Sequence, residues 1–129
     1  MDQQFNRQQQ EEARVGRRAA PIKKARITAV TAGTAQTIYT VPAKRAFELK
    51  SLMISNITAA NIVFSIHAVA PGGSATDDNA EIKSAVIKAN ASDDLAPFIS
   101  KFYEAGYTLR VFCNTTNAVV MGGWGEEVF

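Results

Sequence analysis

The chain has 129 residues, of which 47% are hydrophobic and 20% charged, and its formal net charge is +2. This length corresponds to one domain, and the composition is typical of a globular protein. No apolar run approaches the roughly 18 residues of a membrane-spanning helix, and the polar N-terminus lacks the apolar segment of a signal peptide. We therefore expect a soluble protein with a single core, made in the cytoplasm.

We interpret residues 1–24 as an N-terminal arm. Residues 1–26 contain seven basic and three acidic residues, a charge of +4, whereas residues 27–129 carry a charge of −2. A polar, glutamine-rich segment of this kind does not bury enough apolar surface to fold alone. Its Gln, Glu, Arg and Ala residues tolerate a helix, which Gly16 and Pro21 would limit. We therefore expect an extended, partly helical arm.

The charge of the arm indicates either a solvated tail or a segment that docks on a partner chain. Phe5, Arg14, Arg17 and Arg18 are the candidates for contacts with that partner. We favour a protein partner over nucleic acid, because acidic residues dilute the positive charge and Phe5 is the one aromatic residue of the arm. Deletion of residues 1–24 is expected to leave a folded domain that no longer binds its partner.

Residues 25–129 have the pattern of an all-β domain. Short β-rich runs alternate with turn residues, and no long helix is evident, which predicts a sandwich or a barrel. We expect eight strands, at residues 25–31, 36–41, 45–56, 61–68, 81–89, 98–103, 108–114 and 118–124. Several runs have a period of two, so that one strand face is shared by Ile62, Phe64 and Ile66 and another by Leu109, Val111 and Cys113.

The apolar pattern changes phase within residues 47–54. Phe47 and Leu49 are at odd positions, whereas Leu52 and Ile54 are at even positions. This change predicts either a β-bulge near Ser51 or a strand that is covered on both faces, as in an oligomer.

Two acidic pairs and a long polar loop are interpreted as connections. The loop at residues 71–79 predicts a flexible hairpin connection. Asp77 and Asp78, and then Asp93 and Asp94, lack the alternating spacing and distal Glu of a calcium loop. We therefore expect them to be turn residues, with Asp94 or Asn90 closing a turn through its side chain, and we expect no metal site.

Cys113 and His67 are the chain's one cysteine and one histidine, which excludes an internal disulfide and a four-ligand zinc site. Cys113 shares a face with Leu109 and Val111, which indicates a buried thiol. His67 has no recognisable catalytic partner and is interpreted as a surface or interface histidine. No Gly-x-Ser-x-Gly motif occurs. We expect no enzymatic activity, no catalytic residues and no cofactor.

Three aromatic residues are candidates for a glycan or subunit contact: Tyr103, Tyr107 and Trp124. A lone tryptophan between two glycines more often anchors a core or a subunit contact than a sugar. Tyr103 and Tyr107 are close in sequence, so that a stacking platform for a glycan remains an alternative.

Residues 27–119 resemble small β-sandwich virion proteins of tailed bacteriophages, which include decoration, cement and fibre-associated proteins. The resemblance rests on the segments TIYTVPA (37–43), LKSL (49–52), SNIT (55–58), APGGS (70–74), IKAN (87–90) and EAGYTLRV (104–111). Lys44 stands where this pattern often has glycine, and Tyr107 where it often has aspartate. The resemblance implies a jelly-roll-like sandwich of about eight strands, and binding rather than catalysis.

The resemblance implies a capsid decoration, or cement, protein that binds the assembled head and bridges neighbouring capsid subunits. The alternative is a tail or fibre module that recognises a host-surface glycan. In either case we expect a virion protein made in the host cytoplasm, a homo-oligomer (trimer or dimer), and a partner such as the major capsid protein. Neither nucleic acid nor membrane is expected as a partner.

Overall fold

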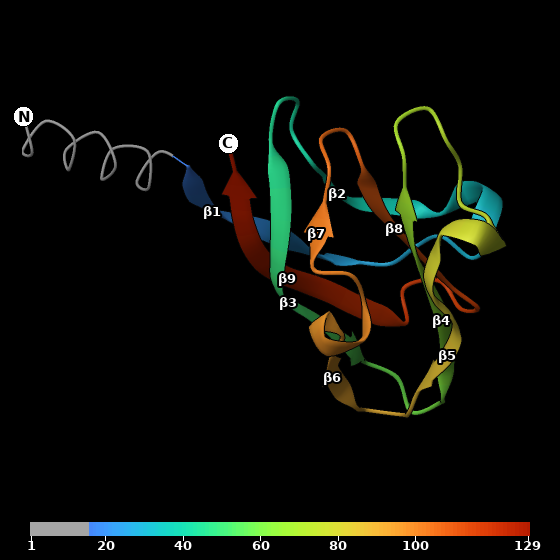
Figure 1. The fold of residues 1–129 in the computed structure, drawn as a ribbon. Coiled ribbons are helices and arrows are strands. Elements are labelled where there is room, and N and C mark those ends of the chain that lie inside the picture. Colours follow the sequence, from blue (N-terminus) through green and yellow to red (C-terminus); the bar gives the residue numbers. More distant parts are fainter. Residues whose placement is uncertain (1–15) are drawn as a thin grey trace, which may run out of the picture.

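The protein is a sandwich of two antiparallel β-sheets (Figure 1). The structure is a computed structural model, and it describes residues 16–129. Sheet A has the strand order β1 (Arg17–Arg26), β9 (Val119–Val128), β3 (Ala46–Asn56) and β6 (Ser92–Asp94), and β7 (Phe102–Tyr103) also pairs with β3. Sheet B has the order β2 (Gln36–Thr40), β8 (Thr108–Cys113), β4 (Ile62–Val69) and β5 (Ala80–Ile87). Three short 3₁₀ helices, η1 (Ala32–Thr34), η2 (Asp77–Asn79) and η3 (Ala96–Phe98), lie in the connections. The all-β prediction is confirmed.

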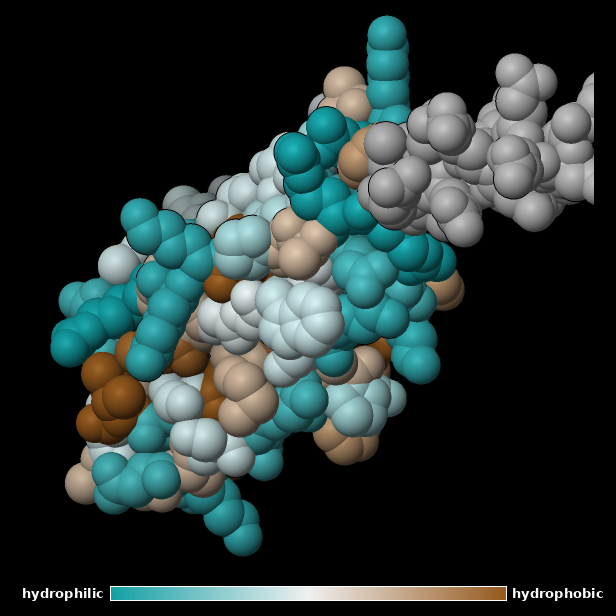
Figure 2. All heavy atoms as spheres, turned by 90° about the vertical axis from the view of Figure 1, so that its left-hand side faces the viewer, coloured by the Kyte–Doolittle hydropathy of each residue, from teal (hydrophilic) through white to brown (hydrophobic). Residues whose placement is uncertain are grey.

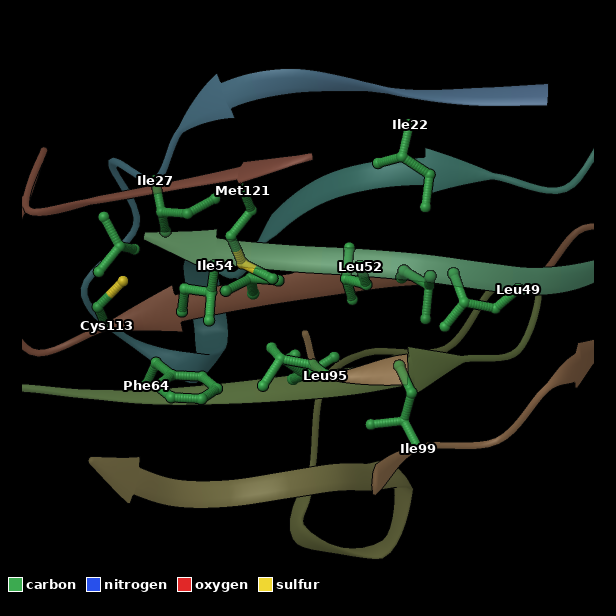
Figure 3. Close-up of a cluster of buried hydrophobic side chains, with 14 of the residues drawn as sticks. Ile22, Ile27, Leu49, Leu52, Ile54, Phe64, Leu95, Ile99, Cys113 and Met121 are labelled. Carbon is green, nitrogen blue, oxygen red and sulfur yellow. The ribbon is translucent and has the colours of Figure 1, made fainter. Parts of the chain in front are cut away.

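The core lies between the two sheets (Figure 3). Its side chains come from alternate residues of each strand, as the period of two predicts. Ile62, Phe64 and Ile66 are all buried, and so are Leu109, Val111 and Cys113. The predictions of both strand faces and of a buried Cys113 are therefore confirmed.

Residues 17–24 belong to sheet A and not to an arm that precedes the sandwich. β1 pairs antiparallel with β9, which places Arg17 opposite Val128 and Ile22 opposite Gly123. Ala20 and Ile22 are buried. Of the expected strand at residues 25–31, only residues 25 and 26 belong to a strand. The sandwich begins before residue 24, where we expected the arm to end. Residues 1–15, with the rest of the expected arm, lie outside the described residues.

The sequence pattern did not predict this strand because its charged residues resemble those of a solvated tail. On an edge strand, however, many side chains face solvent. Arg18, Lys23 and Lys24 are exposed, whereas Ala20 and Ile22 supply the inward alternation. The alternation of these two apolar residues was the available signal in the sequence.

The phase change in β3 is a β-bulge, as the first of the two alternatives predicts. The pairing of β3 with β9 shifts register between Leu49 and Ser51. Leu49 and Leu52 both point into the core because of this extra residue. β9 continues past the expected end at Trp124 to Val128, where it still pairs with β1 and β3. Gly123 and Gly125 allow this close approach, since a Cβ atom on either would overlap atoms of β3.

The region around residues 92–103 differs most from prediction. β6 was not expected, and only residues 102 and 103 of the expected strand at 98–103 form a strand, because η3 occupies its beginning. Asp93 and Asp94 lie in β6 and are not turn residues. Asp94 nevertheless closes the following turn, since its Oδ1 accepts hydrogen bonds from the backbone N–H groups of Leu52 and Ala96, both at 3.1 Å.

Lys44 adopts the left-handed backbone conformation that glycine favours. Its φ is 62°. Lysine thus occupies a backbone position that would also suit glycine.

Two buried polar residues fix the ends of sheet A. The Nδ2 of Asn56 donates to the carbonyl oxygen of Ala60 at 2.7 Å, which ties the end of β3 to the next loop. At the other end, Glu127 accepts hydrogen bonds from the Tyr39 hydroxyl at 3.1 Å and from Arg45 Nη1 at 3.0 Å. Burial, followed by the bond to Glu127, raises the pKa of Tyr39. The buried carboxylate is thus paired, which limits the cost of desolvating its charge.

Candidate functional site

The outer face of sheet A carries an open groove, which we call the sheet A groove. Along β9 the outward positions are Val120, Gly122 and Trp124, and Met53 of β3 lies opposite Gly122. A hollow of about 530 Å³ lies over this part of the sheet. Gly122 itself is covered by β1, since a Cβ atom at this position would overlap the backbone of Lys24. The groove is lined by Ile22, Lys24, Ser51, Met53, Ser55, Val120, Met121, Gly122, Gly123 and Trp124. Seen from the side of sheet A, neutral and hydrophobic atoms occupy the middle of this face and hydrophilic side chains surround them (Figure 2).

The apolar character of this face is unusual for an outer sheet surface. Antiparallel sandwiches normally place polar side chains on the outward positions of their strands. Here the side chain of Trp124 is 47% exposed and that of Met53 is 40% exposed, both in the middle of the sheet. Exposed apolar patches bordered by polar residues mark interaction sites.

One border of the groove is strongly basic. We call Lys23, Lys24 and Arg26 of β1 the cationic rim; all three are exposed. Lys24 lines the groove, and Arg26 pairs with Val120. β1 contains no acidic residue, and none of these three side chains forms a salt bridge with a carboxylate of residues 16–129. The positive charge of the rim is therefore open to a partner.

Arg17, an expected arm contact, is instead part of an ionic network within sheet A. Its Nη1 lies 2.8 Å from Glu48 Oε1 and 3.2 Å from Glu126 Oε2. Lys50 Nζ lies 3.0 Å from the same Glu48 oxygen. The hydrogen bonds from Lys50 and Arg17 lower the pKa of Glu48. Among the other expected arm contacts, Arg18 is exposed but pairs with inward-facing Glu127, so it lies on the side of sheet A away from the groove. Phe5 and Arg14 lie outside the described residues.

The three predicted aromatic residues do not form one site. Tyr103 is buried on β7, and burial, with the nearby Glu81 carboxylate, raises its pKa. Tyr107 is half-buried and borders the same small hollow as Tyr103, of about 200 Å³. Trp124 lies on the outer face of sheet A. The structure thus brings Tyr103 and Tyr107 together and separates both from Trp124.

Sequence reasoning missed Met53, Ser51 and the functional placement of Lys24. All three reach the sheet A groove because β1, β9 and β3 are neighbours in sheet A. For Lys24, the sequence feature that could have predicted this position is its place in a basic segment. For Met53 the only signal was its outward phase after the β3 bulge, which does not reveal its neighbours.

His67 is buried, so the prediction of a surface or interface histidine is wrong. Its ring stacks on Phe112 with centroids 5.7 Å apart. Its Nδ1 lies 3.0 Å from the Thr76 carbonyl oxygen and 2.9 Å from Asn79 Oδ1. Because the carbonyl oxygen accepts only, Nδ1 donates to it. His67 thus holds the loop at residues 71–79 against sheet B. This loop connects β4 and β5, as expected.

Other site types have less support in the part of the chain that the structure describes. Within residues 16–129, no group of three or more His, Cys, Asp or Glu side chains is arranged to hold a metal ion. No helix in this range is long and apolar enough to cross a membrane. The feature that stands out is the sheet A groove with its cationic rim, so the fold and site define a small β-sandwich with an open, partly apolar outer face.

No family model matches the chain, and no curated protein matches it. Among solved structures, the chain is similar to a chain in the crystal structure of the T13 IBDV viral particle, with a TM-score of 0.50 and 9% sequence identity. The match covers 88% of this chain and 31% of that chain, so the protein spans about a third of the length of its structural neighbour. At this identity the likeness shows a shared fold.

Proposed function

We propose that the protein is a structural protein of a virus particle and that its sandwich is a jelly roll. In support, the first four strands pair with successive partners counted back from the C-terminus: β1 with β9, β2 with β8, β3 with β7 and β6, and β4 with β5. This nested pairing is what results when one long antiparallel hairpin folds over into two sheets. Jelly rolls of this kind occur in viral capsid domains.

The specific role that we propose is that of a capsid decoration, or cement, protein on a tailed-phage head. The observation that carries this proposal is the open apolar and basic face of sheet A, which is suited to a broad protein surface. A protein that binds the assembled shell in preference to free subunits stabilises the shell by mass action. A copy that contacts two capsid subunits, or an oligomer of several copies, makes more than one contact with the shell. Each contact raises the effective concentration of the protein for the next contact.

The test is the copy number of the protein in purified particles of the virus that encodes it. Quantitative mass spectrometry gives the ratio of this chain to the major capsid protein. A ratio that is a large fraction of one supports the decoration role. A few copies per particle would favour the tail, neck or fibre instead, and absence from the particle would overturn the proposal of a virion protein.

The second candidate function is glycan recognition by a tail or fibre module. The observation that favours it is the exposed ring of Trp124, with Ser51 and Ser55 in the same groove. Aromatic faces and hydroxyl groups are suited to a sugar ring, although buried Tyr103 does not contribute. A glycan array probed with the native chain and with Trp124→Ala tests it. Hits that the substitution abolishes support this function, and an array without hits contradicts it.

A further inference from the structure

We infer that the sheet A groove and the cationic rim together bind an acidic protein segment that carries an apolar side chain. The apolar side chain would lie in the groove beside Trp124, and carboxylates on the same segment would pair with the rim. The inference rests on the proposed function, since it assigns this segment to a protein of the virus shell and names the face of the sandwich that contacts it.

The groove supplies the site for the apolar side chain. It is lined by Val120 and Trp124 of β9 and by Met53 of β3. Both Trp124 and Met53 lose water-accessible area when an apolar group covers them, which favours binding. Buried tryptophan and arginine residues dominate the binding energy of many protein interfaces.

The rim determines the charge of the occupant. Lys23, Lys24 and Arg26 are concentrated at one end of β1, whereas residues 27–129 carry a net charge of −2. An acidic surface is attracted to this border, which also accelerates its encounter with the groove. A second copy that packed the same face against this one with the two β1 strands on the same side would bring the basic borders together, and like charges oppose that arrangement.

The partner is expected to contact side chains on the sheet face, and not to add a strand at the β1 edge. Pro21 lies in the middle of β1 and has no N–H to donate. Charged side chains and proline are the features by which edge strands resist pairing with another strand. Pro21 pairs with Trp124 across the β1–β9 ladder, so it also extends the apolar surface beside the groove.

The first test measures binding of the full chain to virus particles that lack it, by co-sedimentation. Two variants alter the site: Trp124→Ala, and the double variant Lys24→Glu/Arg26→Glu. The matched control, Lys44→Glu/Lys88→Glu, makes the same charge change at exposed positions outside the groove lining. We expect each site variant to bind about tenfold more weakly or worse, with the control within about twofold of the native chain. Thermal unfolding of every variant verifies that it is folded.

The second test separates this inference from the proposed function. Trp124 is the chain's one tryptophan, so its fluorescence reports occupancy of the groove. The probe is a synthetic peptide of glutamates around one leucine, compared with peptides in which lysine replaces glutamate or serine replaces leucine. We expect only the first peptide to change the fluorescence with saturation, and salt to weaken its binding.

The outcomes are distinguishable. If the native chain does not bind particles but the acidic peptide saturates the groove, the proposed function fails and the chemistry of the face stands. If the native chain binds particles and both site variants bind equally well, the inference about this face is wrong. A single-stranded oligonucleotide or an oligosaccharide that saturates the fluorescence more tightly than the peptide also overturns it.

Discussion

Gly125 faces the interior where Phe47 of β3 fills the core. A Cβ atom at this position would overlap the Glu48 carbonyl oxygen and the Phe47 ring. Both neighbours are held within sheet A, so neither yields easily. We predict that Gly125→Ala lowers the free energy of unfolding by about 1–3 kcal/mol, as overpacking of a core commonly does. Urea denaturation followed by circular dichroism measures this change.

The control for this substitution is Gly33→Ala. A Cβ atom on Gly33 would meet no other atom within 4 Å, and its φ is not positive. We expect a change within about 0.5 kcal/mol, as for most surface substitutions. Equal stability of the two variants would contradict the packing argument.

Cys113 is fully buried among core residues of both sheets. Burial raises the pKa of its thiol to about 11, from an ordinary value of 9.0. We predict that native protein does not react with Ellman's reagent at pH 8, whereas urea-unfolded protein reacts with one thiol per chain. Rapid labelling of the native protein would contradict this prediction.

The raised pKa of Cys113 also makes the free energy of unfolding depend on pH in the alkaline range. Between pH 9 and pH 11 the unfolded chain releases the thiol proton before the folded chain does. The free energy of unfolding therefore falls as pH rises through this window, and the Cys113 contribution is fully present below it. Cys113→Ala, which does not titrate, removes this part of the pH dependence.

At the scale of elements, β1 decides how much of the N-terminus the sandwich needs. Ile22 and Ala20 are buried, and β1 covers the edge of β9. The expectation that deletion of residues 1–24 leaves the sandwich intact does not fit this pairing. We predict that this deletion lowers the melting temperature by about 10 °C or more and promotes aggregation through the exposed β9 edge.

Deletion of residues 1–15 is the matched control, since it retains all of β1. The core cluster of the described residues begins at Ala20, so we expect a melting temperature close to that of the full chain. Differential scanning calorimetry compares the two deletions. A full-length melting temperature in the chain that lacks residues 1–24 would show that β1 is dispensable.

At the scale of the whole molecule, the nested pairing joins the two ends of the described chain. Arg17 lies opposite Val128, and the two strands of each sheet pair are mostly distant in sequence. Such pairs must overcome loop-closure entropy before their contacts form. We predict refolding in milliseconds to seconds, measured by stopped-flow fluorescence of Trp124. Refolding within microseconds would contradict this topology.

The candidate site could be predicted only in part, and its residues show why. The sequence indicated a basic segment and singled out Trp124, but assigned the two to separate sites. It also grouped Trp124 with Tyr103, which is buried on β7. Charge and residue type are local properties, whereas the neighbours of a side chain on a sheet face depend on strand pairing.

The sequence by itself determined the all-β class, the shared faces of β4 and β8 and the buried Cys113, and it limited the phase change near Ser51 to two alternatives. These features follow from the period of two and from its change of phase, which a single strand carries within itself. Only the tertiary structure decided that residues 17–24 form an edge strand and that Lys24, Met53 and Trp124 share one groove. The physical reason is that hydrogen bonds between strands distant in sequence set the register, and no local pattern encodes which strands become neighbours.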